Sequence, residues 1–219
     1  MRDLPSRFRA PRRFLRDNGL SLVLVALFAV SIAGMILTGQ ADLNVERARL
    51  GEPPVGVTAY LGTGDFLSAL FENWESEFLQ MSIYVVLTAV LFQRGSSESR
   101  DPDASDRPDD TAPWRGHPFS GWIYEHSLGL ALVLLFLASF LLHWWFSMSA
   151  ANAEAVRVGA PPLSLAEYLL EPKLWFESFQ NWQSEFLSTA VLVVLSIFLR
   201  QKGSPESKPV GAQNAKTGG

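Results

Sequence analysis

The chain has 219 residues, of which 48% are hydrophobic, and a net charge of −4. Its apolar residues are gathered into long uncharged runs, which excludes an ordinary soluble domain. The absence of cysteine excludes disulfides, thiolate metal sites and thiol redox chemistry. The sequence contains no phosphate-binding loop, zinc-protease motif or nucleophile elbow, so we expect no enzymatic activity, no cofactor and no metal site.

The uncharged runs predict four membrane-crossing helices. A bilayer core of about 30 Å needs about 20 helical residues, and two runs meet this length directly, giving spans of about 19–40 and 126–148. The other two runs are shorter, so their helices must include the polar segments before them, giving spans of about 66–93 and 174–201. The sequence therefore predicts an all-α membrane protein with four transmembrane helices.

The basic residues are distributed unevenly along the chain. Fourteen of the 18 Lys and Arg residues lie in the N-terminal segment 1–17, between the second and third spans, or from Arg200 onward. Basic residues are enriched on the cytoplasmic side of membrane proteins, so we expect both termini to be cytoplasmic. Topology and attraction to anionic lipids explain the basic N-terminus, so we expect the lipid bilayer as a partner and no nucleic acid.

The sequence contains an internal repeat. Residues 14–99 align without a gap to residues 122–207, with 31 identities in 86 positions. Each copy holds two spans, so both enter the membrane in the same orientation, as parallel repeats related by a pseudo-twofold axis along the membrane normal. The predicted segments are the basic cytoplasmic N-terminus 1–17, repeat 1 over 18–94, a disordered cytoplasmic linker 95–121, repeat 2 over 122–202, and a cytoplasmic tail 203–219.

Several local signals refine this outline. Residues 44–50 favour a short helix before a Pro-Pro break. Ser164 and Glu167 have the spacing of a capping box, and Asp65 is the expected N-cap of the second long helix of repeat 1. The first span resembles a signal peptide in its basic start, but the third span repeats its pattern in mid-chain, which argues against cleavage.

The repeated motif N-W-x-S-E-F carries the strongest candidate site. At about 100° per residue, its polar members fall on one helix face and its aromatic members on the opposite face. The predicted polar site consists of Asn73, Ser76, Glu77, Gln80, Asn181, Ser184, Glu185 and Ser188. Glu77 and Glu185 would meet near the pseudo-twofold axis, and carboxylates that share a site inside a membrane suit proton exchange or cation binding.

A second interpretation places the same motif at the outer membrane interface. Counting about 20 residues back from Arg94 puts the edge of the hydrocarbon near Trp74, so Glu77 could reach water. The interfacial aromatic residues would then be Trp74, Trp182, Trp144 and Trp145.

Three other polar residues are expected to lack a buried role. Glu72 and Glu75 become glutamine in repeat 2, which indicates positions in contact with water. His143 stands next to two tryptophans, which favours an interfacial histidine, and a lone imidazole without partners makes no metal site.

Five segments of the chain carry a family resemblance: DNGLSL (17–22), NWESEFLQ (73–80), YEHSLGLAL (124–132), NWQSEFL (181–187) and RQKGSPESKPV (200–210). In these segments the chain resembles a bacterial family of membrane proteins catalogued only as a domain of unknown function. The resemblance implies a bacterial inner-membrane protein with duplicated helix pairs, and it implies no activity or ligand.

Three functional hypotheses follow. The leading one is a non-enzymatic multi-pass membrane protein with a structural, lipid-interaction or partner-interaction role, its partner being a second copy or another membrane protein; it depends on the absence of a deeply buried charge. The alternative is a small proton or cation transporter or channel that uses Glu77 and Glu185. A third is a regulatory protein that signals through the Asp- and Ser-rich linker.

Overall fold

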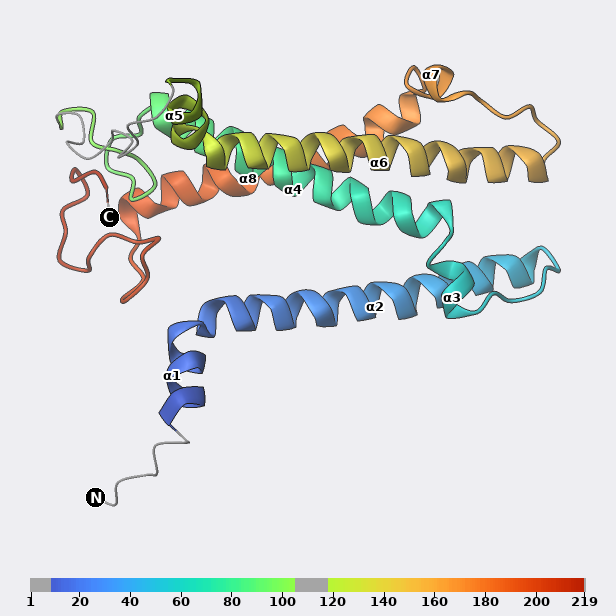
Figure 1. Ribbon diagram of the computed structural model, residues 1–219, viewed down its shortest axis with the longest axis horizontal. Helices are drawn as coiled ribbons and strands as arrows, with labels where there is room; N and C mark the ends of the chain where they lie inside the picture. Colours follow the sequence, from blue (N-terminus) through green and yellow to red (C-terminus); the bar gives the residue numbers. More distant parts are fainter. Residues whose placement is uncertain (1–8, 105–117, 219) are drawn as a thin grey trace. The chain divides into compact units, whose positions relative to one another are not determined.

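The computed structural model describes residues 9–104 and 118–218, and this part of the chain is helical with no β-strand (Figure 1), which confirms the all-α prediction. The chain forms two compact units, residues 1–66 and 67–219. Its helices are α1 (Arg9–Asp17), α2 (Gly19–Arg49), α3 (Val57–Tyr60), α4 (Gly64–Val90), α5 (Pro118–Glu125), α6 (Ser127–Arg157), α7 (Leu165–Tyr168) and α8 (Pro172–Phe198).

Two helices of the described residues, α2 and α6, are long and apolar enough to cross a membrane. Each has 31 residues, and large apolar side chains such as Leu20, Val30 and Leu134 are exposed along them. Exposed apolar surface of this extent suits contact with lipid rather than water. Helices α4 and α8 have 27 residues each, but charged residues in their first halves shorten the uncharged stretch.

The ends of the long helices follow from local sequence. Helix α2 continues without a break to Arg49, so residues 44–49 belong to it, Leu50 is its C-cap, and no separate short helix forms. It ends because Gly51 adopts a positive φ of 75°, which glycine tolerates best. The predicted N-cap of α4 is wrong: Asp65 lies inside its first turn, and the hydroxyl of Thr63 accepts the Phe66 N–H at 3.3 Å.

In unit 1, the segment after α2 folds back against that helix. The Asn44 side chain accepts the Val55 N–H at 2.7 Å and donates to the Val55 carbonyl at 3.1 Å. The Tyr60 ring is buried and packs against Phe66 with ring centroids 5.2 Å apart. Its hydroxyl lies so close to Gly39 that a Cβ added there would be 2.0 Å away.

Gly39→Ala should therefore destabilise unit 1, by about 1–3 kcal/mol, because the new methyl group must displace the buried Tyr60 ring. Gly34→Ala is the matched control on the same helix, since nothing lies within 4 Å of its Cβ position. That control should be neutral or stabilise by up to about 1 kcal/mol. Thermal unfolding of the two variants in detergent tests the contrast, and equal shifts would contradict the packing described.

In unit 2, the segment after α6 makes equivalent contacts. Asn152 bonds both backbone groups of Leu163, at 2.7 Å and 2.8 Å. The Tyr168 hydroxyl lies 2.7 Å from that of Ser147, the residue 108 positions after Gly39. The predicted capping box at the start of α7 is confirmed, because Ser164 and Glu167 bond one another reciprocally.

The hydrogen bonds from the Ser164 side chain and backbone lower the pKa of Glu167 below its ordinary value. A depressed pKa means that this cap contributes stability at pH values above the unfolded-state pKa and loses it as the pH falls through the folded-state pKa. We expect an NMR titration of the Glu167 carboxyl to give a midpoint below about 4.3, the value usual for glutamate. Ser164→Ala removes the hydroxyl and keeps the backbone N–H, so it should raise the midpoint part of the way toward the ordinary value, and an unchanged midpoint would contradict the role of the hydroxyl.

Residues 95–99 of the predicted linker and the tail after α8 pack together, through contacts that the sequence did not predict. Lys208 is 1% exposed, and its ammonium donates to the Gly95 carbonyl and to three other backbone carbonyls. The Gly95 N–H donates to the buried Thr217 hydroxyl at 2.8 Å. Residues 105–117 of the predicted linker lie outside the described residues.

Candidate functional site

A cluster of ionisable side chains is buried between three helices of unit 2. Helix α4 contributes Glu72 and Glu75, α6 contributes His143, and α8 contributes Glu177. We call these four residues the buried centre. Residues three or four positions apart share a helix face, so Glu72 and Glu75 point to the same side of α4.

The core of this centre is a pair of fully buried groups. The side chains of His143 and Glu75 are both 0% exposed, and Nδ1 of the imidazole lies 2.6 Å from Oε2 of the carboxylate. The other Glu75 oxygen accepts the indole N–H of Trp182 at 2.9 Å. An indole only donates, so this Glu75 oxygen accepts, and we assign the proton of the other contact to Nδ1 of His143.

The remaining imidazole nitrogen faces two more carboxylates. Nε2 of His143 lies 3.5 Å from Oε2 of Glu177. One ligand atom from each of Glu72, His143 and Glu177 can be chosen so that all three lie within 4.8 Å of one another. The centre therefore presents one nitrogen and two carboxylate groups to a common point.

Polar neighbours hold these carboxylates in place. The Ser147 hydroxyl donates to Glu177 at 2.9 Å, and the buried Tyr168 hydroxyl contacts the same serine. The Asn181 amide donates to Glu72, and the Lys173 ammonium lies 3.7 Å from the second Glu177 oxygen. Each carboxylate thus has a partner besides the histidine, as a preorganised site requires.

The predicted polar stripe lies mostly outside this centre. Asn181 belongs to its surroundings, Glu77 is exposed and Glu185 is half-buried. Asn73, Ser76, Ser184 and Ser188 donate to carbonyls of their own helices, while Gln80 donates across to Thr189 and to the Glu185 carbonyl of α8. The Glu77 and Glu185 carboxylates lie within electrostatic reach of one another, and their shared site stays a prediction.

The four predicted interfacial tryptophans differ in their surroundings. Trp145 is 53% exposed, and Trp74 is half-buried with its ring edge against Phe71. Trp144 is half-buried and donates to the Leu165 carbonyl at 3.1 Å. Trp182 bonds the buried Glu75, so it has a role in the centre that an interfacial assignment does not include.

Sequence reasoning missed the centre because its residues are not repeated. The positions 108 residues away from His143, Glu177 and Glu75 hold Met35, Ala69 and Gln183. The expectation that Glu75 contacts water is wrong, because its side chain is fully buried. The expectation of no metal site assumed a lone imidazole, whereas α4 and α8 bring carboxylates to it. The sequence signal that could have revealed the centre is a charged residue that is present in only one of the two repeats.

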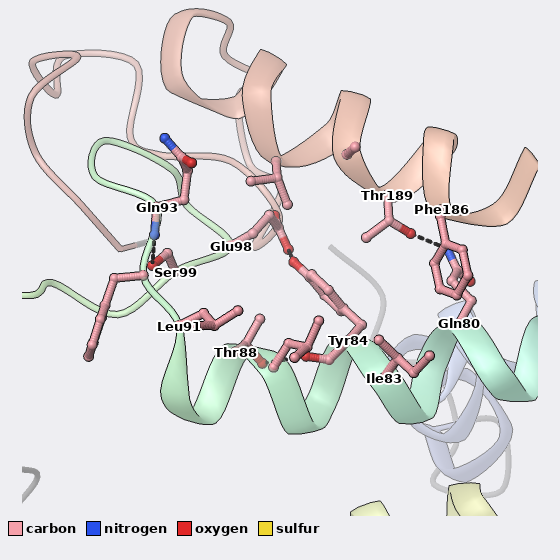
Figure 2. A pocket seen from close by; sticks show the side chains of 14 residues that line it. Gln80, Ile83, Tyr84, Thr88, Leu91, Gln93, Glu98, Ser99, Phe186 and Thr189 are labelled. Carbon is pink, nitrogen blue, oxygen red and sulfur yellow. Dashed lines mark hydrogen bonds between the residues drawn. The ribbon is translucent and has the colours of Figure 1, made fainter. Parts of the chain in front are cut away.

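A separate cavity of about 340 Å³ lies between α4 and α8, toward the ends of both helices (Figure 2). Its lining is mainly apolar, with Ile83, Leu91 and Phe186 among its members. The Tyr84 hydroxyl points across it and donates to Glu98 at 2.9 Å. The cavity shares no lining residue with the buried centre.

Comparison with known proteins places the chain in a family. A search of curated proteins and a search of solved structures each returned no match. The model of a family described as "Domain of unknown function (DUF6766)" matches residues 11–219. This match confirms the resemblance indicated by the N-W-x-S-E-F and K-G-S-P-E-S motifs, and the chain belongs to the DUF6766 family.

Proposed function

We propose that the protein is a non-enzymatic, multi-pass membrane protein that binds a cation at the buried centre and moves it across the bilayer. In this proposal α2, α4, α6 and α8 all cross a bacterial inner membrane, with both termini cytoplasmic. The lipid bilayer is the principal partner, and a second copy or another membrane protein is a further one. The two long apolar helices, α2 and α6, and the fourteen basic residues gathered near the termini and linker support this arrangement.

Matched contacts support the proposed parallel repeat of two helical hairpins. Asn44 and Asn152, 108 positions apart, each bond both backbone groups of the residue eleven positions later. After the second long helix of each copy, the backbone N–H of Gln93 and of Gln201 donates to a serine hydroxyl, at 2.8 Å in both cases. A pseudo-twofold axis along the membrane normal is part of this proposal.

The observation that carries the cation-binding role is the complete burial of Glu75 and His143. Ionisable groups inside membrane segments are costly and are retained where they serve ion or proton pathways. The hypothesis of a purely structural role depended on the absence of a deeply buried charge. The buried Glu75 and His143 remove that argument for it. In this proposal the residues of the buried centre bind the cation. Glu77 and Glu185 belong to the alternative transport site predicted from the sequence.

Reconstitution of the purified chain into liposomes tests this function. We expect flux of a proton, a monovalent cation or a divalent cation, and we expect Glu75→Gln and His143→Gln to abolish it. Glu154→Gln removes an exposed carboxylate in the last turn of α6 and is the charge-matched control that should retain flux. Flux that is lost in the Glu77→Gln, Glu185→Gln double variant but survives in Glu75→Gln would favour the polar stripe. A chain that moves none of these cations would refute the proposal.

A further inference from the structure

We propose that the buried centre binds a divalent transition-metal ion of the Zn²⁺ or Mn²⁺ class, through Nε2 of His143 and one carboxylate oxygen each of Glu72 and Glu177. This inference rests on the proposed function, because it names the cation that the centre accepts. It assigns ligands to three helices of one compact unit, α4, α6 and α8.

The distances suit a common metal ion. Two ligands bound at about 2.0–2.1 Å with tetrahedral angles lie about 3.4 Å apart. Nε2 of His143 and Oε2 of Glu177 are separated by 3.5 Å. The three chosen ligand atoms lie within 4.8 Å of one another, so small side-chain rotations of Glu72 complete the site. Three protein ligands leave one position open, as sites that exchange or transfer their ligand require.

Glu75 prepares the histidine for this role. A metal-binding imidazole characteristically donates its other N–H to a carboxylate, which fixes the tautomer and the ring orientation. Nδ1 of His143 bonds Glu75 at 2.6 Å, which leaves Nε2 for the metal, 3.5 Å from Oε2 of Glu177. The indole of Trp182 holds Glu75 from its other oxygen at 2.9 Å. Glu75 is thus a positioning residue and Glu72 is a ligand, although both lie on α4.

The charge balance also favours a divalent ion. The centre gathers three carboxylates, and Lys173, whose ammonium lies 3.7 Å from Glu177, is 58% exposed. Unbalanced charge buried in a low-dielectric region is strongly unfavourable. A divalent ion between Glu72 and Glu177 would neutralise both. Because imidazole nitrogen favours transition metals, whereas Mg²⁺ and Ca²⁺ prefer all-oxygen sites, the ligand set selects the former class.

Zn²⁺ binding to the full-length chain in detergent, measured by titration calorimetry against a competing chelator, tests the site. We expect one Zn²⁺ per chain and no comparable binding of Mg²⁺. His143→Gln and Glu177→Gln should abolish binding, and Glu75→Gln should weaken it about 10–100-fold, the usual effect of losing the carboxylate behind a metal-bound histidine. Glu154→Gln should bind as the unaltered chain does.

Substitution of a fully buried residue could prevent folding. Glu72→Gln still tests the site in that case, because Glu72 is only half-buried. Circular dichroism and thermal unfolding confirm that each variant is folded. Absence of Zn²⁺ binding to the folded, unaltered chain would overturn the inference and would indicate a metal-free cluster of imidazolium and carboxylates. Equal binding to all variants would overturn it as well.

The flux assay separates this inference from the proposed function. Proton or monovalent flux that depends on Glu75 and His143, without Zn²⁺ binding, would refute the metal site and leave the function intact. Zn²⁺ binding that depends on His143 and Glu177, without flux of any cation, would support the metal site and refute transport.

Discussion

His143→Ala should destabilise the folded chain by about 3–5 kcal/mol, because it removes the imidazole that donates to the fully buried Glu75 carboxylate. The loss is large because Glu75 would keep the Trp182 indole as a hydrogen-bond partner but lose the one at its other oxygen. Reversible unfolding in mixed detergent micelles, followed by tryptophan fluorescence, measures the effect. Leu141→Ala on the same helix is the control, since Leu141 is exposed, and it should cost less than about 1 kcal/mol.

A double substitution distinguishes the loss of the buried polar pair of His143 and Glu75 from the loss of a packing contact. His143→Leu combined with Glu75→Leu replaces both partners by apolar side chains, which is often neutral or stabilising for buried ion pairs. We therefore expect the double variant to be more stable than His143→Leu alone. A double variant that is less stable than either single variant would show that the two residues do not act as a buried pair.

Lys208→Met should release the C-terminal tail from residues 95–100. Lys208 is buried, and its ammonium bonds the carbonyls of Gly95, Ile197, Asn214 and Lys216. Methionine fills the same space but cannot donate, and each buried carbonyl left unpaired costs about 1–3 kcal/mol. Hydrogen exchange of residues 95–100 and 208–218 should accelerate by at least tenfold.

Lys202→Met is the matched control for the tail, because Lys202 carries the same charge and is exposed. Its exchange pattern should match that of the unaltered chain. Equal exchange in both variants would mean that the tail is held by something other than the Lys208 ammonium. Helices α4 and α8 should keep their protection in either case, since Lys208 bonds the last turn of α8 and carbonyls outside the helices.

The course of the helices was predictable because it depends on local sequence. Uncharged runs located α2 and α6, and the Ser164–Glu167 spacing located the start of α7. The end of α2 was misplaced because its helix continues through polar residues after the membrane span, until Gly51 allows the chain to turn. A helix outside the bilayer needs no apolar run, so hydropathy alone does not show where it stops.

The candidate site was not predictable by the same means. The repeat directed attention to residues that recur, such as Glu77 and Glu185, whereas the buried centre uses positions that differ between the copies. Glu75 and His143 are 68 residues apart, and no pattern within one helix shows that they meet. Their contact depends on how α4 and α6 pack, which is a property of the tertiary structure.

The central claim is that the buried centre lies within helices that cross a membrane, and single-cysteine labelling tests it most directly, since the chain has no native cysteine. A membrane-impermeant maleimide should label Gly56→Cys and Ala160→Cys in intact spheroplasts. It should label Ala104→Cys and Gln213→Cys only after permeabilisation. Labelling of all four without permeabilisation, or of Gly56→Cys and Ala160→Cys only after it, would contradict the claim.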